Sequence, residues 1–388
     1  MFGQINSIAA SAGQSPPVDT AAPYSTDSLR GKTIVITGGA SGFGAAFSEK
    51  WARAGAQIII GDINEKMGLE VLSAVKSASG SDIHHFFYCD VTSWESQADF
   101  FRKAVEASAT GGIDAVVPNA GIAETQSPIL GVGFECPVAD NRYKGTGVPD
   151  PRQPRLAVVD VNITGVLYTV HLGLYWMAQN PAPKDHHILL ISSIAGLVSL
   201  PGQALYTASK HAVTGLFRAL RGTAGTVHNG LRVNMLCPYF VETGILPGAG
   251  RALLAGGGKG RVEDVVDAGT RLMSDHAIKG RALVIGPRML LGHDGTIRDD
   301  PKAADLAEED VEFVGVPETS PSGAAIGSYP RGQAVWECYA NDLDTSELFV
   351  WRFVKLLNAM AIYRGWLGVI GDLLSIFQTK PAIKKKTA

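Results

Sequence analysis

The chain has 388 residues, of which 46% are hydrophobic and 18% are charged, and its formal net charge is −3. This composition supplies enough apolar side chains for a large core and excludes a mainly disordered chain. The absence of a basic excess argues against nucleic acid as a partner. The four cysteines lie far apart, so they predict neither a disulfide framework nor a metal site, and they suit a reducing compartment.

The first 28 residues are rich in Ser, Ala, Pro and Gly and contain no long apolar run. No basic segment precedes an apolar one, so they do not predict a signal peptide. We expect residues 1–28 to form a flexible arm before a folded domain over residues 29–290.

From residue 29 onward, short apolar runs alternate with helical patterns of about 10–15 residues. The predicted strands are residues 32–37, 57–60, 85–89, 113–117, 188–191, 231–236 and 281–285. The predicted helices are residues 45–54, 67–78, 94–107, 157–180, 206–228 and 262–274. Such alternation is typical of βαβ units, and near-continuous apolar strands indicate a sheet with helices on both faces. The pattern predicts a Rossmann-type, doubly wound α/β fold with seven parallel strands.

Two segments depart from this pattern. Residues 124–155 are rich in Gly and Pro, and we expect an insertion or a mobile flap there. Residues 291–388 form a C-terminal extension. Its residues 298–332 are acidic, and we expect them to wrap around the surface of the domain or to serve as a linker. Residues 346–377 are apolar with helical character, so we expect a C-terminal helical extension.

The apolar segment 346–377 has two interpretations. Its four charges, at Arg352, Lys355, Arg364 and Asp372, make a plain membrane span costly. Docking on the enzyme or on a partner subunit is favoured, and peripheral contact with a membrane is the alternative. We expect a cytoplasmic protein. The final residues 385–388 also fit a dilysine signal for the cytosolic face of the endoplasmic reticulum, provided that the tail is bound to the membrane.

A glycine-rich turn, TGGASGFG at residues 37–44, lies between the first predicted strand and the first predicted helix. Glycines let the backbone approach a pyrophosphate closely, and the helix N-terminus supplies free N–H groups. A purely structural turn is the alternative. The position of the turn between strand and helix favours dinucleotide binding.

Asp62 closes the second predicted strand, where a carboxylate can accept hydrogen bonds from the ribose hydroxyls of an adenosine. The same carboxylate would repel a 2′-phosphate, and the nearest cation in sequence is Lys66. We therefore expect NAD as the cofactor, with NADP disfavoured. A helix-capping role for Asp62 is compatible with this one.

Tyr206 and Lys210 are four residues apart in a predicted helix, so they share one helical face. Tyrosine ordinarily titrates near pH 10, and a neighbouring ammonium at about 4–5 Å can lower that value by about 2–3 units. The pair therefore predicts a general base or acid that works near neutral pH. Ser193 ends the preceding strand and is expected to hold the substrate oxygen.

Five motifs together resemble those of the short-chain dehydrogenase/reductase family over residues 29–287. They are TGGASGFG at 37–44, CDV at 89–91, NAG at 119–121, ISSIAG at 191–196 and YTASK at 206–210. The stretch from ISSIAG to YTASKHAV is most similar to the branch that contains 15-hydroxyprostaglandin dehydrogenase. Departures from the family pattern include Pro118 before the NAG motif, Tyr239 after Pro238, and extra length between Gly121 and Asn162.

The resemblance implies four catalytic residues: Asn162, Ser193, Tyr206 and Lys210. It also implies contacts to the cofactor from Gly38, Ser41, Gly42, Phe43, Gly44, Asp62, Asp90, Val91, Asn119, Ala120, Gly121, Tyr206, Lys210, Pro238, Val241 and Thr243. Within this set, Asp90 is assigned to the adenine, Asn119 to a ribose and Thr243 to the carboxamide of the nicotinamide. The Asn162 side chain is assigned to a water that connects Lys210 with solvent.

The expected function is NAD-dependent oxidation of a lipophilic secondary alcohol to a ketone. Apolar side chains that we expect at the mouth of the pocket are Leu197, Val198, Leu200, Tyr239 and Phe240. A carbonyl reductase that works in the reverse direction with NAD(P)H is the alternative enzyme. A non-catalytic nucleotide-binding scaffold is a further alternative, which the complete Asn–Ser–Tyr–Lys set disfavours. We expect a homodimer or a homotetramer.

Overall fold

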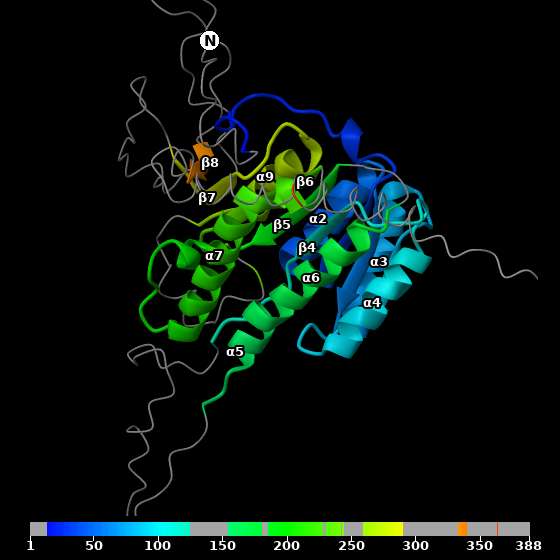
Figure 1. Cartoon of the computed structure of the whole chain (residues 1–388), viewed down its shortest axis with the longest axis horizontal. Helices are drawn as coiled ribbons and strands as arrows, with labels where there is room; N and C mark the ends of the chain where they lie inside the picture. Colours follow the sequence, from blue (N-terminus) through cyan, green and yellow to red (C-terminus); the bar gives the residue numbers. More distant parts are fainter. Residues whose placement is uncertain are drawn as a thin grey trace, which may run out of the picture.

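One mixed sheet organises the protein (Figure 1). The computed structural model describes residues 14–124, 154–180, 185–227, 230–241, 243, 259–289, 333–339 and 363. Within these ranges, eight strands form a sheet in the order β3-β2-β1-β4-β5-β6-β7-β8. They are β1 (Thr33–Thr37), β2 (Gln57–Asp62), β3 (His85–Tyr88), β4 (Ala115–Pro118), β5 (His186–Ile191), β6 (Leu231–Pro238), β7 (Ala282–Met289) and β8 (Gln333–Cys338).

The seven predicted strands and the six predicted helices are confirmed, with shifted bounds. The helices are α2 (Gly42–Arg53), α3 (Glu65–Ser79), α4 (Trp94–Glu106), α5 (Ala157–Val159), α6 (Val166–Met177), α7 (Ala204–Val227) and α9 (Val262–Ser274). Short 3-10 turns are η1 (Asp27–Leu29) and η4 (Ile194–Gly196), and a π-helical turn is η3 (Asp160–Gly165).

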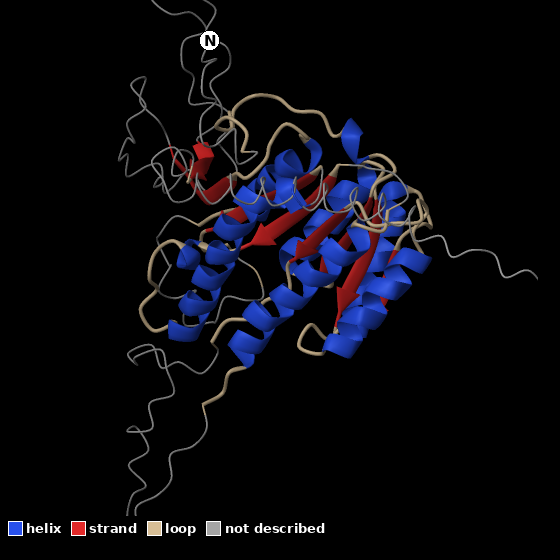
Figure 2. Cartoon of the chain, viewed as in Figure 1, coloured by secondary structure: helices blue, strands red, loops and turns tan. Residues whose placement is uncertain are grey.

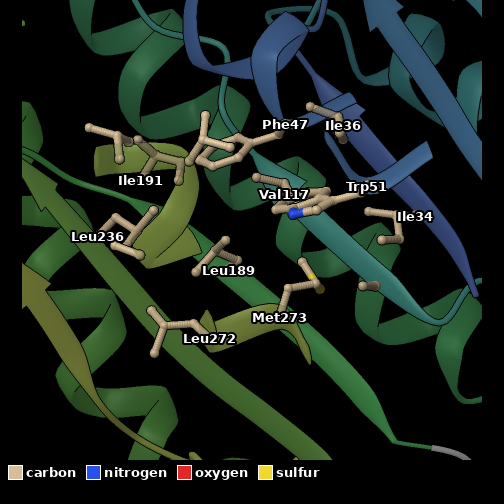
Figure 3. Close-up of a cluster of buried hydrophobic side chains, with 14 of the residues drawn as sticks. Ile34, Ile36, Phe47, Trp51, Val117, Leu189, Ile191, Leu236, Leu272 and Met273 are labelled. Atoms are coloured by element: carbon tan, nitrogen blue, oxygen red, sulfur yellow. The ribbon is translucent and has the colours of Figure 1, made fainter. Parts of the chain in front are cut away.

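Helices cover both faces of the sheet, as Figure 2 shows. On one face, side chains of α2, α3 and α9 pack against the strands, and Phe47 stacks on Trp51 with ring centroids 4.7 Å apart (Figure 3). On the other face, α4, α6 and α7 lie across the sheet. Strands such as Ile58–Ile60 are buried throughout, which explains why their sequences are apolar without alternation.

The order in which the chain adds strands to the sheet reverses between β1 and β4, which are neighbours. From β1 the chain winds outward through β2 to β3, and then returns to β4 on the other side. In open α/β sheets, ligands bind at such a switch point, in the crevice at the carboxyl ends of the strands. The glycine-rich turn after β1 and the NAG motif after β4 therefore meet at this crevice.

The sheet also contains an eighth strand, which the sequence pattern did not predict. β8 comes from the C-terminal extension and pairs antiparallel with β7, with Val284 opposite Trp336. The edge of a parallel sheet exposes unpaired backbone groups, and β8 satisfies those of β7. The C-terminal extension thus contributes to the catalytic domain itself.

The flexible arm expected over residues 1–28 is also wrong from Gln14 onward. The Ser15 N–H donates to the Lys279 carbonyl at 3.0 Å, and the Val18 N–H donates to a carboxylate oxygen of Glu337 at 2.8 Å. Glu337 also lies 3.4 Å from Arg281, so the segment packs against β7 and β8 through buried charges. These partners are more than 260 residues away in sequence, so local composition does not reveal them.

A buried ionic cluster lies at the amino edge of the sheet. The guanidinium of Arg232 pairs with Asp185 at 2.5 Å and donates to the Leu272, Met273, Asp275 and Ile278 carbonyls at the end of α9. Lys32 lies 2.7 Å from the same carboxylate. Hydrogen bonds and positive charge from Arg232 and Lys32 hold the pKa of Asp185 well below its usual range, although burial opposes this shift.

The continuous helix of residues 157–177 is long and apolar enough to cross a bilayer. Its α6 portion packs against β4 and α4, with Val166, Val170 and Leu172 buried, so its apolar character matches a core helix of this domain. The predictions for most of the insertion 124–155 and for nearly all of segment 346–377 lie outside the described residues.

Candidate active site

Four predicted side chains converge at the carboxyl edge of the sheet. Ser193 follows β5, and its hydroxyl donates to the Pro238 carbonyl at 3.4 Å. It also lies close enough to Tyr206, near the start of α7, to lower the pKa of that residue. The Lys210 ammonium lies one helical turn further along, 5.6 Å from the centroid of the Tyr206 ring. A Cβ on Gly121 would lie 3.4 Å from Asn162 Oδ1 and 3.7 Å from Lys210 Nζ. The side chains of Asn162 and Lys210 therefore both end beside Gly121.

The π-helical turn η3 determines the position of Asn162. This turn carries the buried Asn162 side chain, which accepts from the Ile122 N–H and donates to the Ile122 carbonyl, both at 2.9 Å. Asn162 Nδ2 also lies 3.0 Å from the Ser209 hydroxyl on α7. π-turns are frequent at functional sites. Here the turn joins the loop after β4 to the helix that carries Tyr206.

Burial changes the acidity of the Tyr–Lys pair. Desolvation lowers the pKa of Lys210 to about 8, because burial removes the ammonium from water. The ammonium donates to the Ile191 carbonyl at 3.1 Å. Desolvation raises the pKa of Tyr206, whereas the hydrogen bond with Ser193 lowers it. The lowered Tyr206 pKa that the sequence spacing predicts is therefore absent in the protein alone. The reason is burial, which removes the Tyr206 hydroxyl from water and disfavours the phenolate.

The glycine-rich turn forms a cradle that side chains would fill. Gly38 has φ +65, and a Cβ there would lie 2.6 Å from the Ala120 Cα atom. A Cβ on Gly44 would lie 2.5 Å from the Gly38 carbonyl, which also accepts from Asn119 Nδ2 at 2.8 Å. The turn after β1 and the NAG motif are thus in backbone contact.

The mouth of this cradle presents groups that fit a dinucleotide phosphate. Ser41 is exposed, and its hydroxyl makes no capping bond to α2, so it is available to a ligand. Gly42 has φ +52, and a Cβ there would lie 3.9 Å from Thr243. The helix N-terminus of α2 supplies backbone N–H groups at the same place. Residues predicted to hold the cofactor therefore surround one open turn.

Asp62 lies at the end of β2, beside this cradle. One carboxylate oxygen accepts from the Ala40 N–H at 3.0 Å, and the other accepts from the Asn64 N–H at 2.9 Å. The side chain remains partly exposed. Asp90 lies on the neighbouring strand end, where it accepts from the Thr92 N–H at 2.9 Å. The two carboxylates thus sit together where the sequence places the adenosine.

Some predicted cofactor residues turn their side chains into the core. Val91 packs against Gly165, Val241 lies in the cluster under α2 and α9, and Pro238 is buried at the end of β6. Phe43 is partly buried against the same cluster as Val241. The buried side chains of Val91, Val241 and Pro238 leave their backbones to contact a cofactor, whereas part of the Phe43 side chain stays exposed.

Apolar side chains are exposed on segments that adjoin the predicted catalytic residues in the chain or the fold. Ile122 follows the NAG motif, Leu156 precedes α5 and Val198 follows η4, and 38%, 40% and 51% of their surfaces are exposed. Only Val198 belongs to the predicted pocket mouth. Ile122 and Leu156 were not singled out in the sequence, because single apolar residues in loops carry no local signal. Tyr239 and Phe240 pack edge to face, with centroids 4.9 Å apart.

Sequence reasoning also missed Glu124 as a partner of α7. Its carboxylate accepts from the Tyr206 N–H at 3.1 Å and lies near the Leu205 N–H. Burial raises the pKa of Glu124, and the two backbone N–H groups oppose this shift. Within the described ranges, no three His, Cys, Asp or Glu side chains form a group that could hold a metal ion.

Residues 32–252 match the family model of the short chain dehydrogenases, which is more than half of the chain. The chain belongs to this family. It is therefore an oxidoreductase that acts on CH–OH groups with a nicotinamide cofactor. The dehydrogenase has the family's Rossmann-type sheet, to which β8 adds an antiparallel strand.

Relatives of this dehydrogenase act on hydroxylated compounds, according to their names. It is 36% identical over 272 residues to 5'-hydroxyaverantin dehydrogenase of Dothistroma septosporum, covering 67% of this chain and 85% of the relative. It is 30% identical over 218 residues to the NAD(+)-dependent 15-hydroxyprostaglandin dehydrogenase of Rattus norvegicus, covering 56% and 71%. It is also 31% identical over 268 residues to an NADP-dependent dehydrogenase of a Phoma species, covering 66% and 74%.

A solved structure agrees with the fold. The 3-ketoacyl-(acyl-carrier-protein) reductase from Brucella melitensis, complexed with NADH, superposes with a TM-score of 0.53 at 25% identity. The match covers 66% of this dehydrogenase and 97% of that chain. Relatives that use NAD and NADP both occur, so the nicotinamide class is established by family membership, and the choice within it is a separate question.

Proposed function

We propose that this dehydrogenase oxidises a lipophilic secondary alcohol to a ketone with NAD, and that Tyr206 is the general base. The observation that carries the proposal is the position of the buried Lys210 ammonium, 5.6 Å from the centroid of the Tyr206 ring, with Asn162 beside it and Ser193 close enough to affect the pKa of Tyr206. A hydroxyl pair at the end of a strand, next to a buried ammonium, is suited to hold an alcohol and to remove its proton.

When bound, NAD accepts the hydride from the alcohol carbon and adds a positive charge near Tyr206. The Tyr206 phenolate takes the hydroxyl proton, so the alcohol loses one proton and one hydride and becomes a ketone. Ser193 donates a hydrogen bond to the substrate oxygen and orients it. Lys210 stabilises the phenolate through its charge, and Asn162 holds the loop and the helix on either side of this ammonium.

Tyr206→Phe tests this mechanism, because it removes the hydroxyl and keeps the ring. We expect kcat for NAD-dependent oxidation to fall by about 10²–10⁴-fold, while the Kd for NADH stays within about twofold. The matched control is Tyr175→Phe on the exposed face of α6, which should leave kcat unchanged. Full turnover by Tyr206→Phe would reject Tyr206 as the base.

We also propose NAD in preference to NADP, and Asp62 supports this choice. Its carboxylate is held at the cradle by the Ala40 N–H and would face the 2′-phosphate of NADP. Like charges at about 4 Å repel by about 4 kcal/mol at an effective dielectric near 20, before solvent screening reduces this value. Asp62→Ala should narrow the NAD preference by about 10–100-fold in kcat/KM. Equal use of both cofactors by the wild type would contradict this assignment.

The substrate class is part of the proposal. Exposed Ile122, which is bonded to Asn162, favours an apolar alcohol, as do the exposed side chains of Leu156 and Val198, which flank α5 and η4. The names of two relatives specify hydroxylated substrates. Purified enzyme with NAD and a series of secondary alcohols of increasing apolar size would reveal the class through NADH absorbance. We expect kcat/KM to rise with apolar size. The carbonyl-reductase alternative predicts that ketone reduction with NADPH is the faster direction.

We further propose a cytoplasmic homodimer or homotetramer. Leu167 and Tyr175 on α6 are 46% and 54% exposed, and such apolar side chains on one helix would be covered in an assembly of two or four subunits. Light scattering of the purified protein distinguishes these states from a monomer.

A further inference from the structure

Helix α7 begins without a good cap of its own. The Gln203 carbonyl accepts the first helical hydrogen bond, from the Thr207 N–H at 2.9 Å, so Gln203 occupies the N-cap position. Glutamine is not among the side chains that cap helices well, and Pro201 and Gly202 before it offer no side-chain acceptor. The free N–H groups of the first turn therefore need an acceptor from elsewhere.

Glu124 supplies this acceptor from a different part of the chain. Its carboxylate accepts from the N–H group of Tyr206 at 3.1 Å and lies close enough to the N–H group of Leu205 for that group to lower its pKa; these are the third and second residues of α7. The Gln203 side chain donates to the Glu124 carbonyl at 3.3 Å. A negative charge at a helix N-terminus also interacts favourably with the helix dipole. One of the capped N–H groups belongs to Tyr206 itself.

Glu124 is held firmly enough to act as an anchor. Two residues before it, the backbone of Ile122 makes both of its hydrogen bonds with the Asn162 side chain. Asn162 in turn lies against Ser209 on α7. The loop after β4 is thus fastened to α7 at two places, and the Lys210 ammonium lies beside this loop at Gly121.

We propose that Glu124 is a positioning residue that caps α7 from outside the helix and thereby sets the position of the Tyr206 hydroxyl. The inference rests on the proposed role of Tyr206 as the base. Glu124 touches the backbone of Tyr206 and takes no part in proton transfer. Its loss lets the first turn of α7 fray, and small displacements of a reacting group cost rate.

The test compares Glu124→Ala with the double variant Glu124→Ala/Gln203→Asp. The aspartate at the N-cap position provides a local cap that replaces the carboxylate of Glu124. In Glu124→Ala we expect kcat to fall about 10–100-fold, with the Kd for NADH within about twofold. Amide hydrogen exchange of residues 204–207 should become faster. In the double variant, both exchange protection and kcat should recover, kcat by at least about fivefold.

Glu70→Ala on the exposed face of α3 is the matched control, since it removes a carboxylate far from α7. If Glu124→Ala does not fold, the same comparison is made between Glu124→Gln and the double variant Glu124→Gln/Gln203→Asp. The proposal is overturned if kcat of the Glu124 variant stays within twofold of wild type. It is also overturned if Gln203→Asp restores amide protection without restoring kcat.

Failure of the proposed function would look different. In that case Tyr206→Phe keeps full turnover, or the wild type oxidises no alcohol, whatever happens to α7. The exchange measurement still decides whether Glu124 caps the helix, because it does not depend on turnover. If the amide exchange rates of residues 204–207 are unchanged in Glu124→Ala, the hypothesis that Glu124 caps α7 is wrong.

Discussion

Two buried cations at opposite edges of the sheet have contrasting surroundings. At the amino edge, Arg232 has a carboxylate partner, Asp185, and four backbone carbonyls around it. At the carboxyl edge, Lys210 donates to the Ile191 carbonyl, and no carboxylate pairs with it within the described part of the chain. Both side chains are almost fully buried.

The difference shows that one buried cation stabilises the fold, whereas the other is placed to act in the reaction. A fully paired guanidinium fastens α9 to the sheet, and its charge is unavailable to anything else. An ammonium without a carboxylate partner is less stable in its charged form, which is why its pKa is lowered to about 8. That same charge is free to act on a neighbouring phenolate or a ligand.

The largest expected effect is on catalysis at the carboxyl edge. Lys210→Met keeps the length of the side chain and removes its charge, so kcat/KM for oxidation should fall by about 10³-fold, a loss of about 4 kcal/mol. The free energy of unfolding should stay level or rise, because a buried charge without a carboxylate partner is removed. Steady-state kinetics and urea denaturation measure the two quantities. If Lys210→Met lost much stability and little rate, Lys210 would serve the fold, as Arg232 does, and the contrast between the two cations would be wrong.

The next effect is on stability at the amino edge. Asp185→Asn leaves Arg232 and Lys32 without their carboxylate, so the free energy of unfolding should fall by about 3 kcal/mol. The kcat should stay within about twofold of wild type, because the cluster lies at the far edge of the sheet. Asp82→Asn is the control: its salt bridge with Lys76 is exposed at the surface, so the change should cost about 0.5 kcal/mol or less.

The stability effect of Asp185 should also depend on pH. Its pKa in the folded state is well below the ordinary value, so its stabilising contribution is complete above the unfolded-state pKa of about 3.9. The contribution is lost as pH falls through the folded-state pKa. The difference between wild type and Asp185→Asn should therefore be constant from about pH 5 to 7 and should shrink below about pH 4. A difference that grows on acidification would contradict the assignment.

The smallest effects come from two glycines. Gly44→Ala places a Cβ 2.5 Å from the Gly38 carbonyl and 2.6 Å from Asn119 Nδ2, so it should raise the Kd for NADH by about tenfold. Gly215→Ala on α7 meets no atom within 4 Å, so it should raise the free energy of unfolding by about 0.5–1 kcal/mol. Fluorescence titration and denaturation compare the two variants. Equal cofactor affinity in both would show that the cradle tolerates a side chain.

The sequence pattern was sufficient to predict the parallel sheet. Runs such as Ile58–Ile60 are buried on both faces, so their apolar character reports directly on their environment. The residues proposed for catalysis were also found in this way, because strand ends and a four-residue helical spacing bring Ser193, Tyr206 and Lys210 together.

Long-range contacts account for what the pattern did not predict. β8 has an unremarkable sequence, QAVWEC, and its identity as a strand depends on pairing with β7. The π-turn around Asn162 is hidden inside a helical pattern. Glu124 stands in a Gly- and Pro-rich stretch, and only the fold reveals that its carboxylate meets α7, about 80 residues later. The acidity of Tyr206 was also wrongly predicted, because sequence spacing does not include burial.

The position of β8 affects how the protein can be made. During synthesis, the chain up to β7 is complete well before Gln333–Cys338 leaves the ribosome. Until then, β7 is an outer strand with an open row of hydrogen-bonding groups, and nascent chains on neighbouring ribosomes carry the same open row. Such edges promote pairing between chains. A messenger truncated before codon 333 would therefore yield a product that is prone to aggregation, even though every strand and helix around the proposed catalytic residues is encoded.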